Sequence, residues 1–198
     1  MDDAVKTSYI KAGRIASEVR GQAAEMIQDG ALLLDVAEFA ESEIRRMGAK
    51  PAFPVNLAID NIAAHYTPHS EDPLRFETGQ LVKLDLGAHI DGYIADTAVT
   101  VEVSSSNRMK LINASAGALD AVTEALRPGI MVRDLGTIIE GFIHSHGFEP
   151  ISNLSGHSLE QFNLHAGISV PNVSDTSTLD LKPGTAVAIE PFATNGVG

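Results

Sequence analysis

The sequence contains no cysteine, and only 14 of its 198 residues are lysine or arginine. Without cysteine, disulfides, thiolate metal sites and cysteine nucleophiles are excluded, so His, Asp and Glu remain as the strong metal ligands. Such ligands suit a hard or borderline divalent cation. The 14 basic residues face 26 acidic ones, giving a net charge of −12. Nucleic acid and anionic membranes are therefore poor partners.

The chain also lacks a secretion signal at its start and any run of eighteen apolar residues. We therefore expect a cytoplasmic protein with no membrane segment. Its length and its 44% of apolar residues allow one sizeable core. The sequence contains no low-complexity tract or solenoid repeat, so we expect a single domain over residues 1–198.

Helical and extended patterns alternate along the chain, which predicts an α+β fold with helices covering one face of a mostly antiparallel sheet. A capping box at Asp35 is predicted to open the second helix, and Asp134 is predicted to cap the fourth. Residues 155–158 are predicted as a turn, and residues 67–80 as a surface loop. The expected helices cover residues 3–29, 35–47, 107–127 and 134–146, and the expected extended segments cover 52–59, 80–103, 148–151 and 185–192.

Residues 81–101 have the pattern of two apolar strands joined by Asp91-Gly92. Asp-Gly between two strand-like runs is a strong hairpin signal, because a type I′ turn needs positive φ at both central residues. The sequence therefore predicts a β-hairpin with a two-residue turn.

Two aspartates, Asp85 and Asp96, lie within this apolar hairpin. The predicted turn places Asp85 opposite Ala98, with Asp96 two residues away on the same face, so the carboxylates are diagonal neighbours roughly 7–8 Å apart at Cα. Burying two like charges is costly without a counter-ion, which a metal would supply. Two alternatives stay open: an aspartate faces water at a sheet edge, or the register slips and the diagonal disappears.

His157 and Glu190 are the other ligand candidates. His157 follows Gly156, which permits a close backbone approach, although a structural role is equally open. Glu190 stands in the apolar run 185–192, where a carboxylate needs a cation, an ion-pair partner or a proton, unless it lies at the surface of the strand end. With Asp85 and Asp96 they form a set that fits a divalent hydrolytic centre better than structural zinc.

The remaining histidines are less informative from the sequence alone. His144 and His146 fall in the last turn of a predicted helix, where a cation favours the helix dipole. His69 and His89 are expected in solvated turns. Taken by itself, His65 is interpreted as a core or loop histidine whose ring nitrogens have ordinary hydrogen-bond partners.

Four ordered motifs carry a resemblance to a known family. Residues 53–68, 85–101, 156–167 and 189–194 resemble type II methionine aminopeptidases in their archaeal form. The resemblance implies the duplicated pita-bread (creatinase/aminopeptidase) fold. It also implies a cytosolic exopeptidase that removes the initiator methionine from nascent chains, with two divalent ions of cobalt, manganese, iron or zinc. We expect a monomer whose ribosome contact is at most transient.

The same resemblance implies a role for each matched residue. Asp85 would bind the first metal and Asp96 would bridge the two, with His157 as the histidine ligand. Glu190 would be both a metal ligand and the general base. Two histidines and one aromatic residue would contact the substrate: His65 at the scissile amide or leaving amine, His165 at the carbonyl oxygen, and Phe53 in the wall of the methionine pocket.

The resemblance is incomplete. Family members carry one more glutamate ligand together with a helical insertion and closing strands, and no residue here matches them. We therefore expect a C-terminally truncated catalytic domain with an incomplete second half and weak activity. His69 and Glu160 are lesser departures.

Two alternatives to this function are kept. A pseudoenzyme of the same fold would bind partner proteins or the ribosome, but it would have no reason to keep uncompensated carboxylates. A proline dipeptidase of the same fold is less consistent with residues 63–68.

Overall fold

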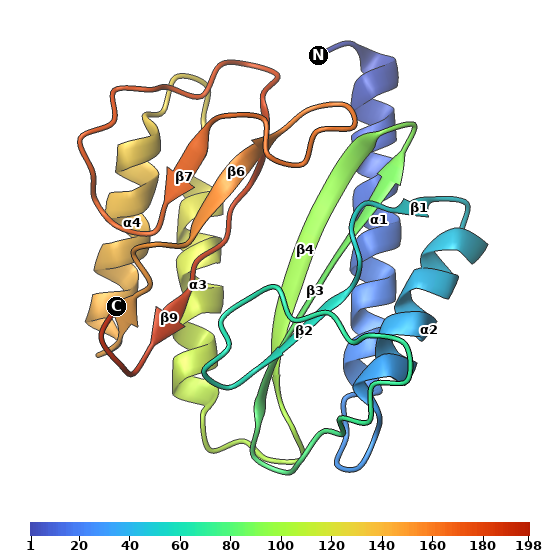
Figure 1. Cartoon of the computed structure of the whole chain (residues 1–198). Coiled ribbons are helices and arrows are strands. Elements are labelled where there is room, and N and C mark those ends of the chain that lie inside the picture. The colour runs from blue at the N-terminus through green and yellow to red at the C-terminus, as the bar shows by residue number, and fades with distance from the viewer. The chain divides into compact units, whose positions relative to one another are not determined.

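A computed structural model describes all 198 residues, which form two compact units (Figure 1). The N-terminal unit comprises residues 2–108 together with 161–163. The C-terminal unit comprises residues 109–160 and 164–198, with Met1. None of the helices is both long and apolar enough to cross a membrane. The expectation of a single catalytic domain stays a prediction.

Two helices open the N-terminal unit: α1 (Asp3–Glu25) and α2 (Leu33–Arg46). The side chain of Asp2 caps α1, accepting a hydrogen bond from Val5 N at 2.8 Å. The predicted capping box at Asp35 is wrong, because Leu32 is the N-cap of α2 and makes no side-chain cap bond. The backbone N–H of Leu33 donates to the carbonyl of Leu74 at 3.1 Å, so a tertiary contact satisfies one of the amides at the helix start that have no partner within the helix.

Four antiparallel strands complete this unit: β1 (Lys50–Pro51), β2 (Asn56–Ile59), β3 (Leu81–Ile90) and β4 (Tyr93–Glu102). Strand β3 pairs with β4 along one edge and with β1 and β2 along the other. Asp91 and Gly92 have φ values of 51° and 89°, so the predicted two-residue hairpin turn is confirmed. Figure 1 shows α1 running along this hairpin.

The two faces of β3 differ in polarity. One face carries Val82, Leu84, Leu86 and Ala88, all fully buried in a core built with α1 and α2. Alternate residues point to the opposite face. The predicted surface loop 67–80 also contributes to the core, because Phe76 is fully buried and bonds to Ala31 through its backbone.

The C-terminal unit contains two helices and five short strands. Its strands form a three-stranded sheet of order β7-β6-β8 and a separate β5-β9 pair. A buried apolar cluster holds α3 and α4 against residues of these strands. The elements are α3 (Met109–Ala125), α4 (Val132–Ser145), β5 (Glu149–Pro150), β6 (Ser155–Leu159), β7 (Ser169–Pro171), β8 (Ala186–Ala188) and β9 (Ala193–Thr194).

Three predictions for this unit are wrong. Met131 rather than Asp134 is the N-cap of α4, and again a backbone bond, from Val132 N to Leu179 O, replaces the side-chain cap. Residues 155–158 belong to strand β6, because β7 and β8 pair with them on both sides. The predicted strand 185–192 is broken, since β8 ends at Ala188 and β9 begins at Ala193.

The two units share an order of elements, which we call the frame, in which an isolated β-bridge precedes the second helix. Leu32 bridges Arg75 in the N-terminal unit, and Met131 bridges Asp180 in the C-terminal unit. Each bridge directly precedes a 14-residue helix, α2 or α4. The same order of two helices followed by strands therefore occurs twice in the chain.

Candidate metal and substrate site

Asp85 and Asp96 lie on the polar face of the N-terminal sheet. Asp85 is opposite Ala98, and Asp96 is opposite Gly87, so the register predicted from the sequence is confirmed. Both aspartates are half-buried. We call this surface, with Lys83, Asp85, His89 and Asp96, the aspartate face. It presents two carboxylates one diagonal step apart, which is the arrangement that metal binding needs.

Phe53 packs directly on the aspartate face. A methyl group added to Gly87, the residue paired with Asp96, would lie 2.4 Å from Cε1 of Phe53 and 3.0 Å from Cβ of Ala52. Only a residue without a side chain allows this approach. The structure therefore puts the predicted pocket aromatic beside the predicted metal ligands of the same unit.

Asn56 is a residue of this face that sequence reasoning missed. It pairs with Asp85 in the β2–β3 register, and its Oδ1 accepts a hydrogen bond from Thr67 Oγ1 at 2.7 Å. The available signal was a polar residue within the apolar run 55–59. The contact ties the segment that follows His65 to the strand beside Asp85.

His65 has a positive φ of 66°, which is unusual for a residue with a side chain. The next residue fixes this conformation, because the carbonyl of Tyr66 accepts a hydrogen bond from Leu57 N at 2.7 Å. Backbone conformations of this kind persist only where surrounding contacts hold them, and they cluster at functional sites. No sequence pattern predicted this conformation of His65.

A short polar cluster supports the same segment. The hydroxyl of Tyr66 donates to Asp72 Oδ2 at 2.7 Å, and Leu74 N donates to Asp72 Oδ1 at 3.0 Å. Both bonds stabilise the carboxylate and hold the pKa of Asp72 below its usual value. The bond from Tyr66 has the largest effect, followed by the bond from Leu74. The bond to Asp72 also raises the pKa of Tyr66.

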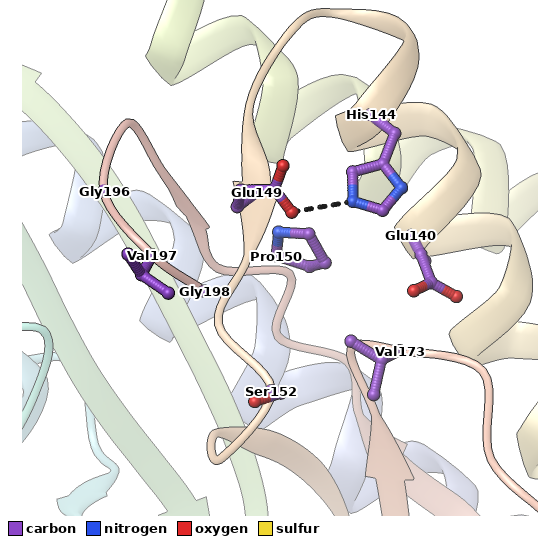
Figure 2. Close-up of a pocket in the computed structure, with 9 residues that line it drawn as sticks. All are labelled: Glu140, His144, Glu149, Pro150, Ser152, Val173, Gly196, Val197 and Gly198. Carbon is purple, nitrogen blue, oxygen red and sulfur yellow. Dashed lines mark hydrogen bonds and ion pairs between the residues drawn. The ribbon is translucent and has the colours of Figure 1, made fainter.

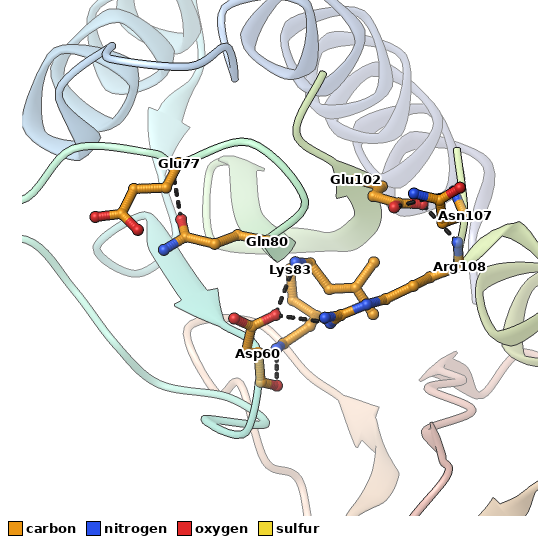
Figure 3. A network of polar contacts seen from close by, with 8 residues as sticks. Asp60, Glu77, Gln80, Lys83, Glu102, Asn107 and Arg108 are labelled. Carbon is orange, nitrogen blue, oxygen red and sulfur yellow. Dashed lines mark hydrogen bonds and ion pairs between the residues drawn. The ribbon is translucent and has the colours of Figure 1, made fainter. Parts of the chain in front are cut away.

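Lys83 lies two residues before Asp85 and was also missed. Its Nζ donates to the carbonyl of Asp60 at 2.7 Å, and Asp60 Oδ1 pairs with Arg108 at 3.0 Å (Figure 3). Burial lowers the pKa of Lys83 to about 8, against a smaller opposing effect of Asp60. A cation alternating with Asp85 along β3 was the signal in the sequence.

Glu102 fixes the base of the hairpin, at the end away from the turn. Its carboxylate accepts hydrogen bonds from Asn107 N at 3.0 Å and Arg108 N at 2.7 Å (Figure 3). Burial by itself would raise the pKa of Glu102, but these hydrogen bonds hold that pKa below its usual value. Both ends of the hairpin are therefore fixed.

His157 occupies the middle of β6 in the C-terminal unit. It pairs with Ser169 of β7 and with Ala188 of β8, and only 8% of its surface is exposed. Gly156 permits this packing, because a methyl group there would lie 2.3 Å from the carbonyl oxygen of Ala188. The predicted close approach at Gly156 is confirmed, although it occurs within a sheet and not in a turn.

Glu190 follows β8 and reaches His157. Its Oε1 lies 3.1 Å from Nε2 of His157, and the glutamate side chain is 30% exposed. A nitrogen and a carboxylate oxygen thus converge within one unit. These are the atom types that bind first-row divalent cations.

His165 is exposed but lies against the same histidine. Its ring centroid is 4.3 Å from that of His157, in an edge-to-face arrangement. Ala166 N, the next residue, donates to Ser158 O at 2.8 Å. The C-terminal unit therefore groups His157, His165 and Glu190, while the N-terminal unit groups Phe53, His65, Asp85 and Asp96 around β2 and β3.

A separate pocket of about 490 Å³ lies in the C-terminal unit (Figure 2). It contains a contact between His144 Nε2 and Glu149 Oε2 at 2.9 Å, and Glu140 accepts a hydrogen bond from Ser174 N nearby. None of the residues expected at the site lines it. This pairing agrees with the structural role expected for His144.

The sequence matches the model of metallopeptidase family M24 over residues 7–198, and the chain belongs to that family. The methionine aminopeptidase of Methanocaldococcus jannaschii is 51% identical over 189 residues, which are 96% of this chain and 64% of that protein. The chain therefore spans less than two thirds of that relative. The resemblance to archaeal methionine aminopeptidases is confirmed.

Solved structures agree on the fold. The methionine aminopeptidase of Thermotoga maritima superposes with a TM-score of 0.89 at 24% identity, covering 99% of this chain and 82% of that one. The prolidase of Pyrococcus furiosus gives a TM-score of 0.82 at 29% identity, covering 96% of this chain and 56% of that one. The chain thus has the α+β fold of these enzymes, as the resemblance implied.

Proposed function

We propose that this chain is the catalytic part of a metal-dependent aminopeptidase that removes the N-terminal methionine from proteins. The observation that carries the proposal is the convergence of His157 Nε2 and Glu190 Oε1 at 3.1 Å, in a chain whose hairpin presents Asp85 and Asp96 on one face. The 51% identity to a methionine aminopeptidase supports the choice of substrate.

The donor set fits divalent cations. Asp85, Asp96, His157 and Glu190 offer three carboxylates and one imidazole without a thiolate, as hard and borderline ions prefer. We propose two ions of cobalt, manganese, iron or zinc, with Asp96 as the bridging ligand. When bound, they would polarise the scissile carbonyl and lower the pKa of the attacking water.

The side chains of the chain then divide the remaining work. Glu190 accepts a proton from water while the water oxygen forms a bond to the carbonyl carbon. Glu190 then gives this proton to the leaving amine as the C–N bond breaks. His165 donates a hydrogen bond to the carbonyl oxygen as charge develops there. His65 contacts the scissile amide or the leaving amine, and Phe53 forms an apolar wall for the methionine side chain.

A proline dipeptidase is the competing enzyme of the same fold. Among the solved structures the prolidase is 29% identical to this chain and the methionine aminopeptidase of Thermotoga maritima is 24% identical, so fold likeness favours neither activity. The 51% sequence identity to a curated methionine aminopeptidase favours methionine release. An Ala-Pro dipeptide distinguishes the two activities, because a prolidase would cleave it and an enzyme specific for N-terminal methionine would not.

The test is methionine release from the peptide Met-Ala-Ser by the purified protein with added MnCl2, followed by mass spectrometry. We expect release from the wild type and from Asp120→Asn, an exposed position on α3, and none from Glu190→Gln. Equal release from Glu190→Gln, or faster cleavage of Ala-Pro than of Met-Ala-Ser, would overturn the proposal.

A further inference from the structure

Phe162 is the exception among the aromatic residues of the chain. It is 72% exposed and has a positive φ of 57°, a conformation that side chains disfavour. Neither core packing nor backbone preference explains a phenylalanine there. A strained residue persists only where its surroundings hold it, so the contacts of Phe162 are informative.

The segment 161–163 is fastened to the turn of the β3–β4 hairpin. Phe162 N donates to Gly92 O at 2.8 Å, and Gln161 Nε2 donates to Asp91 O at 2.7 Å. The Phe162 ring stands edge-on to His89, with centroids 5.7 Å apart. We call this set of contacts the turn clip. It attaches residues 161 and 162 to a hairpin turn that lies about seventy positions earlier in the sequence.

Gly92 is fitted to the ring. A methyl group added at Gly92 would lie 2.5 to 2.7 Å from three atoms of Phe162. His89 is held on the other side, because its Nδ1 accepts a hydrogen bond from Gly92 N at 3.0 Å. The ring of Phe162 therefore occupies a defined site against Gly92 and His89, and a smaller side chain would leave that site empty.

The clip lies three residues before His165. Three residues span at most about 11 Å when fully extended, so fixing residue 162 limits where His165 can go. On its other side, His165 is followed by the bond from Ala166 N to Ser158 O. His165 itself is exposed and has no hydrogen bond to a main-chain group of its own. Its position therefore depends on the contact of its ring with His157 and on the anchors before and after it.

We propose that Phe162 is a positioning residue, which seats on the hairpin turn and thereby fixes the loop that presents His165 to the substrate carbonyl. The inference rests on the proposed function, in which His165 stabilises that oxygen. Phe162 does not touch substrate in this scheme and acts only through the placement of His165. A misplacement of about 1 Å at such a group costs on the order of 100-fold in rate.

The kinetic test uses three substitutions of Phe162 with the Met-Ala-Ser assay. Phe162→Ala removes the ring, Phe162→Gly removes it and also relieves the positive φ, and Phe162→Tyr keeps an aromatic ring. We expect kcat to fall at least about tenfold in the Ala and Gly variants, with KM changed less than about threefold. The Tyr variant should retain wild-type kcat. Unchanged kcat in Phe162→Ala would overturn the proposal.

A double-mutant cycle separates positioning from a general loss of structure. If Phe162 acts through His165, the double variant Phe162→Ala/His165→Ala should be no slower than His165→Ala alone. Losses that multiply in full would show that Phe162 acts elsewhere and would also overturn the proposal. Binding of Mn²⁺ measured by calorimetry should stay within about twofold of wild type in Phe162→Ala, since no proposed ligand is removed.

A nuclear magnetic resonance measurement tests the proposal without any turnover. In wild type, the amide of residue 162 should be protected from hydrogen exchange by its bond to Gly92, and the His165 ring should give one sharp signal. Phe162→Ala should lose both features, while Phe162→Tyr keeps them. Unchanged protection and an unchanged His165 signal in Phe162→Ala would overturn the positioning role. Absence of methionine release from wild type would instead reject the proposed function.

Discussion

The two units share a helical frame but place their candidate ligands by different means. In the N-terminal unit, Asp85 and Asp96 lie on adjacent strands of one hairpin, and the turn between them sets their register. In the C-terminal unit, His157 lies on β6 and Glu190 follows β8, so pairing between distant segments brings them together. A local turn therefore positions one pair, and long-range sheet formation positions the other.

The frame also relates single residues of the two units. Asp85 lies ten residues after the bridge residue Arg75, and Glu190 lies ten residues after the bridge residue Asp180. Ala58 pairs with Lys83 in one sheet, and His157 pairs with Ala188 at the corresponding place in the other. Asp85 and Glu190 thus occupy matched positions. The residue that matches His157 is Ala58, whose side chain is a methyl group.

The largest effect should come from removing the carboxylates at the matched positions. Asp85→Asn and Glu190→Gln each lose a negative ligand, and we expect Mn²⁺ affinity to fall at least about 100-fold and methionine release about 1,000-fold. Calorimetry with MnCl2 and the Met-Ala-Ser assay measure the two losses. Asp96→Asn should behave alike, and Asp120→Asn is the control. Equal metal content in Asp96→Asn and wild type would contradict the assignment.

The hairpin could be derived from the sequence because its information is local. Asp91-Gly92 specifies the turn, and the turn then fixes the partner of every residue on both strands. β6 could not be recognised in the same way, because its partners lie far along the chain and Gly156 reads locally as a turn residue. The strand expected around Glu190 was wrong, since β8 ends at Ala188, and the assignment of Glu190 as a metal ligand stays a prediction.

Helix starts show the same division between local and distant causes. Asp35 and Asp134 have the sequence of capping residues, yet the first amide of each helix is satisfied by a carbonyl of a segment distant in sequence. The left-handed conformation of His65 and the exposure of Phe162 were equally hidden, because both depend on contacts with other strands. Sequence reasoning therefore predicted the register of the hairpin but not the long-range contacts that support the candidate site.

The next effect tests the long-range pairing through Gly156. Gly156→Ala would place a methyl group against the backbone of Ala188, which cannot move without breaking the sheet, and we expect a loss of about 3 kcal/mol in unfolding free energy. Urea unfolding measures it. Gly141→Ala on an open position of α4 is the matched control and should stabilise by about 0.5–1 kcal/mol. A neutral Gly156→Ala would contradict the close approach.

A tightly packed glycine of the N-terminal unit, Gly87, should behave differently. At Gly87 the obstacle is the ring of Phe53 rather than backbone, so Gly87→Ala should cost only about 1 kcal/mol as the ring moves aside. That movement should raise KM for Met-Ala-Ser about tenfold while Mn²⁺ affinity stays unchanged. Steady-state kinetics and calorimetry check both. An unchanged KM would argue against Phe53 as part of the methionine pocket.

A smaller effect concerns acid stability of the segment beside His65. Because the pKa of Asp72 is lowered in the folded protein, its contribution is present above pH 3.8 and is lost as pH falls below that value. Tyr66→Phe removes the largest cause of the lowering. We expect its acid unfolding midpoint, followed by circular dichroism, to lie at a higher pH than that of wild type. Coincident acid transitions would exclude the Tyr66–Asp72 bond as a source of stability.

The smallest expected effects separate true caps from apparent ones. Asp35→Ala and Asp134→Ala should each cost about 0.5 kcal/mol, the loss of a favourable charge in a first helical turn. Asp2→Ala removes a real cap bond and should cost about 1 kcal/mol. Thermal unfolding of the three variants compares them. A larger cost at Asp35 than at Asp2 would restore the capping box inferred from the sequence.

The locality of the hairpin has a consequence for how the chain is made. Protein synthesis proceeds from the N-terminus, and domains generally fold as units during it. Both aspartates, the turn between them and the helices that cover the other face of β3 lie within the first 108 residues. The hairpin can thus close on the emerging chain before His157 and Glu190 have been translated. Segment 161–163 arrives later and docks on a turn that is already formed.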